Sequence, residues 1–116
     1  MKKLKKTTVP ILNDTYYVYL LYGDKNKAEK WVSDYYPFTL DKYPFENNKG
    51  ATFHGDGYHP TIWISEDAPE PYSTVAHEAV HAIKWIWNDI GEYNHDEVFA
   101  HSVGTIVRYF IKLLEK

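Results

Sequence analysis

The sequence contains no cysteine among its 116 residues. Without cysteine, neither a disulfide framework nor a thiolate zinc site can form, so any bound metal must be held by His, Asp or Glu side chains. No apolar run approaches the roughly 18 residues that a membrane-spanning helix needs, and no signal-peptide pattern follows the basic N-terminus. We therefore expect a soluble, cytoplasmic protein with no membrane partner.

The sequence also lacks a broad excess of positive charge. Its net charge is -3 and its pI is about 6.0, which argues against nucleic acid as a partner. Lysines cluster only at the start, and we expect residues 1–8 to form a flexible basic N-terminus. A hydrophobic share of 44% and an aromatic share of 17% indicate a packed core. The length suits one domain over 1–116.

Hydrophobic periodicity predicts elements in the order β-α-β-β-α-α, an α+β fold with a short, mostly antiparallel sheet and a C-terminal backing helix. The expected N-caps of the three helices are Asp24, Ser73 and Asn94. The expected elements are a strand over 15–22, a helix over 24–36, a surface loop over 37–50, a hairpin of strands 51–54 and 58–65, and helices over 73–91 and 94–114.

The motif His77-Glu78-Ala79-Val80-His81 lies on the helix expected over 73–91. Residues four apart share one face of a helix, so both imidazoles can reach one ion. Glu78 lies about 100° around the helix from His77, where its carboxylate can take a proton from metal-activated water. Apolar residues occupy the opposite side of the helix. The pattern predicts a zinc site with Glu78 as general base; the alternative is two solvated surface histidines.

A catalytic zinc site needs a third protein ligand, and the expected last helix offers Glu97 and His101. We favour Glu97, which shares a polar stripe with His101, Gly104 and Arg108; Gly104 would permit close approach of another helix. Glu97 could instead close a capping box with Asn94. His101 is either the rival ligand or a donor that stabilises an oxyanion. We expect His54 and His59 to be exposed turn residues.

The segments Thr74-Val-Ala-His-Glu-Ala-Val-His-Ala82 and Asp96-Glu-Val-Phe-Ala100 resemble the gluzincins, and more narrowly the short zinc-peptidase-like proteins of phages and prophages. The resemblance covers roughly residues 61–111 and implies a zincin-like fold. It implies His77, His81 and Glu97 as metal ligands and Glu78 as the general base. It also implies that the strand before the motif helix is a sheet edge that pairs with an extended peptide, here around Ile62–Ile64.

These patterns predict a zinc-dependent metallopeptidase that hydrolyses peptides with metal-activated water, Glu78 as base and His101 or a tyrosine beside the oxyanion. A second hypothesis is a catalytically inactive, zinc-stabilised module, possibly phage-encoded, that binds a protein through its aromatic surface. A third is a hydrolase for a non-peptide substrate. The expected cofactor is Zn²⁺, although a His-His-Glu site also accepts other divalent ions.

Overall fold

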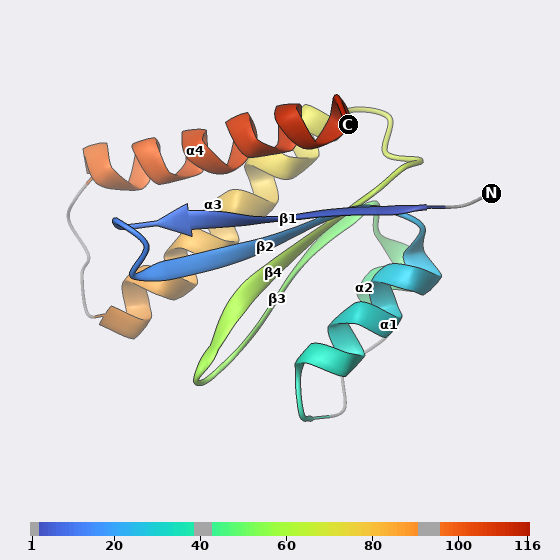
Figure 1. The fold of residues 1–116 in the computed structure, drawn as a ribbon, viewed down its shortest axis with the longest axis horizontal. Helices are drawn as coiled ribbons and strands as arrows, with labels where there is room; N and C mark the ends of the chain where they lie inside the picture. Colours follow the sequence, from blue (N-terminus) through green and yellow to red (C-terminus); the bar gives the residue numbers. More distant parts are fainter. Residues whose placement is uncertain (1–2, 39–42, 91–95) are drawn as a thin grey trace.

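Four strands and four helices make up the protein in a computed structural model that describes residues 3–38, 43–90 and 96–116 (Figure 1). In chain order the elements are β1 (Leu4–Ile11), β2 (Tyr16–Gly23), α1 (Lys25–Tyr35), α2 (Tyr43–Asn47), β3 (Gly50–Gly55), β4 (Tyr58–Ser65), α3 (Pro71–Ile90) and α4 (Asp96–Leu114). The Cα radius of gyration is 13.5 Å. A single domain of 100 residues has a radius of about 13 Å, so the α+β chain forms one domain.

The four strands form one mixed sheet in the order β1-β2-β4-β3. β1 and β2 are antiparallel, as are β3 and β4. The central strands β2 and β4 run parallel, with Tyr19 paired to Thr61. A parallel pair needs a long crossover connection, which here carries α1, α2 and β3. Most of the strand pairing is therefore antiparallel, as the sequence predicts.

The expectation that Ile62–Ile64 forms a sheet edge is wrong. These residues lie in β4, which pairs with β2 on one side and with β3 on the other. The side chains of Ile62, Trp63 and Ile64 are at most 1% exposed. Such an unbroken apolar run is typical of a central strand that is buried on both faces. The sheet edge nearest α3 is β3.

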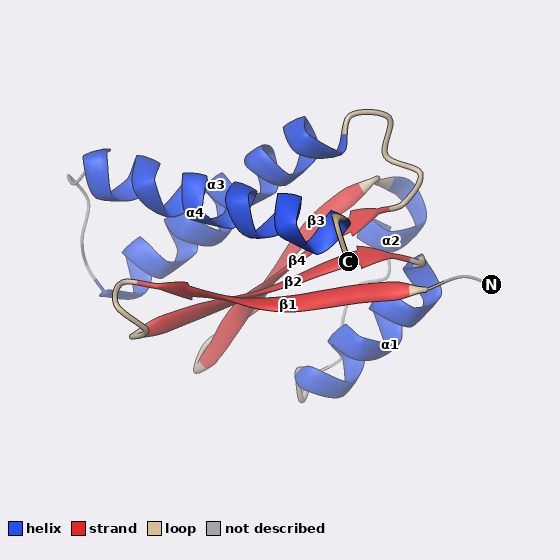
Figure 2. Ribbon diagram, turned by 45° about the horizontal axis from the view of Figure 1, so that its top comes forward, coloured by secondary structure: helices blue, strands red, loops and turns tan. Residues whose placement is uncertain are grey.

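Helices cover both faces of the sheet, which gives the domain three layers (Figures 1 and 2). α3 and α4 pack on one face, where Val18 and Leu20 of β2 point. α1 and α2 pack on the other face, where Leu21 of β2 and Trp63 of β4 point. Neighbouring residues of β2 thus enter different cores, because successive strand side chains alternate between faces.

Two segments differ from the sequence-based expectations. Residues 4–8 belong to β1 and are not a flexible N-terminus; Val9 and Ile11 of the same strand are buried under α4 and α3. Lysines on an edge strand are compatible with pairing, since they discourage further strand addition. The predicted loop over 37–50 contains α2, whose Phe45 is 3% exposed and stacks on Phe53 of β3.

One of the three predicted helix caps is confirmed, and Ser73 is not a cap because it lies inside α3. The Asp24 carboxylate accepts a hydrogen bond from the Lys27 backbone N–H at 3.1 Å, which confirms the N-cap of α1. α3 begins at Pro71, two residues before the expected cap, because proline is well tolerated in the first turn of a helix. Gly91 and Asn94 lie outside the described residues.

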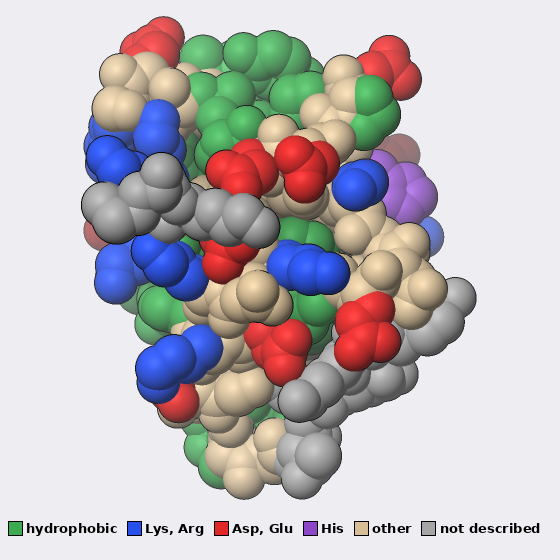
Figure 3. Space-filling view, turned by 90° about the vertical axis from the view of Figure 1, so that its right-hand side faces the viewer, with side chains coloured by type: hydrophobic (Ala, Val, Ile, Leu, Met, Phe, Trp, Pro, Cys, Tyr) green, Lys and Arg blue, Asp and Glu red, His purple; other side chains and the backbone are tan. Residues whose placement is uncertain are grey.

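The surface carries mixed charge. On the face that Figure 3 shows, Lys and Arg side chains are interspersed with Asp and Glu side chains. This arrangement agrees with the modest net charge of -3. None of the helices in the described residues is long and apolar enough to cross a membrane.

Candidate metal centre and active site

α3 presents two chemically different sides. Its core side is apolar and packs on the sheet and on α4, whereas His77 and His81 are exposed on the opposite side. The sequence predicts this separation, because the apolar residues recur with helical spacing. The buried residues are Val75, Ala79, Ala82, Ile83, Ile86 and Trp87.

His77 and His81 converge on one point. Their Nε2 atoms lie 3.2 Å apart, and their rings are nearly perpendicular at 75° with centroids 4.8 Å apart. Two nitrogens bound to one tetrahedral zinc ion at about 2.0–2.1 Å would lie about 3.3 Å apart. A hydrogen bond between two neutral tautomers has a similar length. The pair thus has the spacing of two metal ligands without any change of rotamer.

Glu78 sits beside the histidine pair, on the flank of α3 that faces β3. Its side chain is 12% exposed, against 69% for His77, and its Oε2 atom lies 4.0 Å from Nε2 of His77. The hydroxyl of Thr52 on β3 lies 2.7 Å from Oε1 of Glu78 and 3.0 Å from the Glu78 carbonyl oxygen. The shorter contact, to the charged acceptor, is the stronger one. Thr52 therefore fixes the orientation of the Glu78 carboxylate, and the other oxygen, Oε2, faces His77.

An open hollow of about 620 Å³ adjoins His77 and Glu78. Its other wall is the segment from α2 into β3, which brings polar side chains opposite the histidine. β3 and α3 approach closely here: a Cβ atom on Gly50 would lie 2.6 Å from Cγ2 of Thr74. Glycine at position 50 thus permits the contact that brings β3 beside Glu78. The lining residues are Asn47, Asn48, Lys49, Gly50, Ser73, Thr74, His77 and Glu78.

His54 lies further along β3, on the same face as Thr52. Its ring stacks on Trp85 of α3, with centroids 5.4 Å apart and planes at 26°. Burial lowers the pKa of His54, and the Asp56 carboxylate offsets part of this effect. His54 is exposed overall, as expected, although its stack on Trp85 shields part of the ring. Neither histidine is a turn residue as predicted: His54 lies in β3, and His59 lies in β4 and is only partly exposed. The sequence gives no signal for this stack or for the Thr52 contact, because both depend on how β3 lies against α3.

Glu97 and His101 do not join the histidine pair. Both are exposed on α4, and within the described residues no group of three His, Asp or Glu side chains is placed to hold a metal ion. His101 lines a different hollow, against the β1–β2 turn. α4 packs on α3 through Phe99 and Trp87, away from the flank of α3 that carries Glu78. The expected third ligand is therefore missing from this arrangement.

Gly104 does not serve the close helix contact suggested by the sequence. A Cβ atom added at Gly104 would meet no atom within 4 Å. The polar stripe of α4 that contains Glu97 and Gly104 thus faces away from its helical neighbour. The stripe itself is as predicted, but it does not form a ligand-bearing interface with α3.

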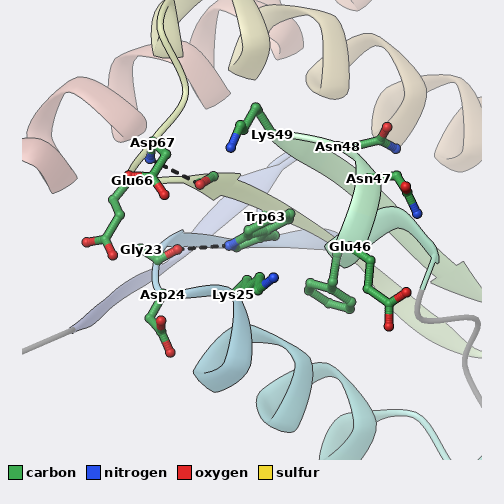
Figure 4. A pocket seen from close by; sticks show the side chains of 12 residues that line it. Gly23, Asp24, Lys25, Glu46, Asn47, Asn48, Lys49, Trp63, Glu66 and Asp67 are labelled. Carbon is green, nitrogen blue, oxygen red and sulfur yellow. Dashed lines mark hydrogen bonds between the residues drawn. The ribbon is translucent and has the colours of Figure 1, made fainter.

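A separate polar pocket of about 320 Å³ lies where the parallel strands β2 and β4 end (Figure 4). Its walls carry carboxylates, such as Asp24 and Glu66, together with the amines of Lys25 and Lys49. The indole N–H of Trp63 points along its floor and donates to the Gly23 carbonyl oxygen at 3.2 Å. Mixed charges and a satisfied indole give this pocket no single ligand chemistry.

Among the described residues, the histidine pair, the fixed Glu78 carboxylate and the adjoining hollow are thus the part best suited to metal-assisted chemistry. Comparison of the chain with protein-family models, with curated proteins and with solved structures finds no match.

Proposed function

We propose that the protein is a zinc-dependent peptide hydrolase, with His77 and His81 as metal ligands and Glu78 as general base. The observation that carries the proposal is the 3.2 Å separation of the two Nε2 atoms, with a carboxylate held beside them. The resemblance of residues 74–82 to the gluzincins and to phage-encoded zinc-peptidase-like proteins gives the same assignment. A cytoplasmic location is part of this proposal.

The zinc ion would be held by the Nε2 atoms of His77 and His81. The chemistry that zinc supplies in such a site is Lewis-acid polarisation of a carbonyl oxygen and a lowered pKa of water. Both rings lie on the solvent side of α3, so substrate and water can reach the pair without opening the fold. The third ligand is not assigned by this geometry, because Glu97 and His101 lie elsewhere on α4.

Glu78 would move the proton. As a water oxygen bonds to the peptide carbonyl carbon, one water proton passes to Oε2 of Glu78 and then to the amine nitrogen released when the C–N bond breaks. Thr52 occupies Oε1, so Oε2 is the oxygen available for this transfer. A positioned base of this kind contributes about 10²- to 10⁴-fold to the rate.

An extended peptide would lie along β3. Peptide recognition by strand addition requires an unpaired sheet edge, and β3 ends the sheet on the side of α3. Thr52 of this strand contacts Glu78, so a peptide paired to β3 would pass beside the base. The edge assigned here replaces the one expected around Ile62–Ile64.

The second candidate is a catalytically inactive zinc-stabilised binding module. It is favoured by the missing three-ligand group within the described residues, because two histidines can hold a metal without creating a complete catalytic site. The two candidates differ in what Glu78 does. Only the hydrolase depends on the Glu78 carboxylate.

The test combines metal analysis with digestion of a peptide library. Protein purified without added metal is compared with Glu78→Gln and with the double variant His77→Ala/His81→Ala. For the hydrolase, wild type cleaves peptides, Glu78→Gln keeps the ion but loses cleavage by about 100-fold or more, and the double variant loses both. Retained metal without cleavage in wild type supports the binding module. Stoichiometric metal in the double variant would remove both candidates.

A further inference from the structure

A further, smaller cavity lies beyond Trp85, at the end of α3 that follows the histidine pair. It has a volume of about 180 Å³ and lies between the last turns of α3, the start of β2 and the β3–β4 turn. Trp85 separates it from the seam where His54 and Thr52 face α3. The lining residues are Tyr16, Gly57, Tyr58, His59, Trp85 and Asp89.

Aromatic rings form most of the wall, and their neighbours hold them in place. His54 stacks on Trp85, which also lines the cavity. Tyr58 meets Tyr35 edge to face, at 88° and 5.5 Å between centroids. Rings held in this way are already oriented before a ligand binds, which lowers the entropic cost of binding. The negatively charged faces of Trp and Tyr rings attract cations.

Asp89 supplies the charge of the cavity. Its Oδ2 atom accepts a hydrogen bond from the Tyr16 hydroxyl at 3.3 Å. Asp89 lies in the last turn of α3, which contains no basic residue and whose carbonyl groups add partial negative charge. No Lys or Arg side chain is among the six lining residues. Asp89 therefore gives the part of the wall that the structure describes a net negative charge.

His59 does not oppose this charge. Its Nδ1 atom accepts a hydrogen bond from the Tyr17 backbone N–H at 3.3 Å, so the ring carries no proton on that nitrogen and is neutral. The His59 ring also packs edge to face on Tyr17, at 88° and 5.4 Å between centroids. Tyr16 remains a neutral donor, because burial and the Asp89 charge raise the pKa of its hydroxyl.

We propose that this cavity binds an organic cation, a quaternary or alkylammonium group, between the rings of Trp85 and Tyr58 with Asp89 as counter-ion. A metal ion does not fit this wall, because an ion requires several ligands and the wall supplies only one carboxylate. A neutral aromatic ligand would leave the carboxylate without a positive partner. The cation can come from a free small amine or from the side chain of a lysine residue in a peptide, and both offer the same chemistry.

The experiment is an NMR titration that follows the indole signal of Trp85. The probes are choline and its uncharged isostere 3,3-dimethylbutan-1-ol. Two further arms use an acetylated Gly-Lys-Gly amide and the same peptide with an acetylated lysine amine. We expect saturable shifts with choline and none with the isostere. Binding of the lysine peptide, lost on acetylation, identifies a peptide source, and binding of choline alone identifies a free amine.

Two variants make the assignment specific. Asp89→Asn keeps the shape of the wall and should weaken choline binding by about tenfold or more, whereas the matched variant Asp67→Asn, on an exposed carboxylate outside the cavity, should bind as wild type does. Tyr58→Leu should also weaken binding. Equal binding of choline and its isostere, undiminished binding by Asp89→Asn, or the absence of any saturable shift would overturn the proposal. None of these readouts depends on peptide hydrolysis, so failure of the proposed enzyme activity leaves the test intact.

Discussion

The hydroxyl of Thr52 lies 2.7 Å from Oε1 of Glu78 and ties the motif helix to the edge strand of the sheet. A carboxylate that is only 12% exposed needs such a donor, because a buried charge without a partner is costly. The contact thus has two consequences that can be measured separately, one for stability and one for the orientation of Glu78.

Replacing Thr52 with Val should lower the free energy of unfolding by about 1–3 kcal/mol, because the Glu78 carboxylate loses its hydrogen-bond donor while staying partly buried. Urea unfolding of the two proteins measures the difference. Thr52→Ser keeps the hydroxyl and should restore most of the loss. Destabilisation by Ser but not by Val would mean that the methyl group of Thr52, rather than its hydroxyl, supports the fold, because Val keeps the methyl group and Ser keeps the hydroxyl.

Single substitutions in the histidine pair should each reduce the metal content of the purified protein. His77→Ala and His81→Ala each remove one of two convergent Nε2 donors. The one histidine that remains does not hold zinc tightly by itself. Elemental analysis of protein purified without chelator measures the effect. His54→Ala, which removes an exposed histidine that stacks on Trp85, is the control and should retain the ion. Equal metal loss in all three variants would argue against a specific pair.

The two candidate third ligands can be tested together. In the present geometry Glu97→Gln and His101→Gln should both retain the ion, because neither side chain forms a ligand group with the pair. Isothermal titration with zinc gives the affinities. Loss of at least tenfold in Glu97→Gln alone would restore the ligand set that the sequence predicts, and would require the start of α4 to approach the pair when metal binds.

His54 should make the stability of the fold depend on pH. Burial lowers the pKa of His54 in the folded protein. Below about pH 6.5, this imidazole is therefore protonated more fully in the unfolded chain than in the folded one, which favours unfolding. The unfolding free energy should therefore fall as pH decreases from about 7.5 to 5.5, and this contribution should be absent above the usual imidazole pKa. Urea unfolding at the two pH values, for wild type and His54→Gln, measures it. An identical fall in both proteins would exclude His54 as a source.

Local patterns predict the elements that carry the strongest periodicity. The α1 cap at Asp24, the hairpin around Gly57 and the exposed side of α3 with its two histidines all follow from sequence. β1 has no comparable signal in the sequence, because its lysines are typical of a solvated terminus and a proline such as Pro10 is unfavourable in a strand except at an edge.

Local sequence patterns do not predict which distant strands pair with each other. The parallel pairing of β2 with β4 makes β3 the edge. The apolar run of residues 62–64 is typical of a central strand, but it does not indicate which strands lie beside it. The same limit applies to the site. The motif predicts the pair and the base, whereas the Thr52 contact depends on how β3 lies against α3.

The parallel pair also constrains how the protein folds. Tyr17 and His59, which meet near the start of this pairing, are 42 residues apart, whereas the β1–β2 and β3–β4 hairpins join neighbouring segments. Closing a long loop costs entropy before its contacts can offset that cost, so the hairpins can form first. Docking of one hairpin on the other should then limit the folding rate. The contact between Thr52 and Glu78 lies within β3, β4 and α3, which follow one another in the chain and pack directly together, so this part of the site can assemble before the two hairpins dock.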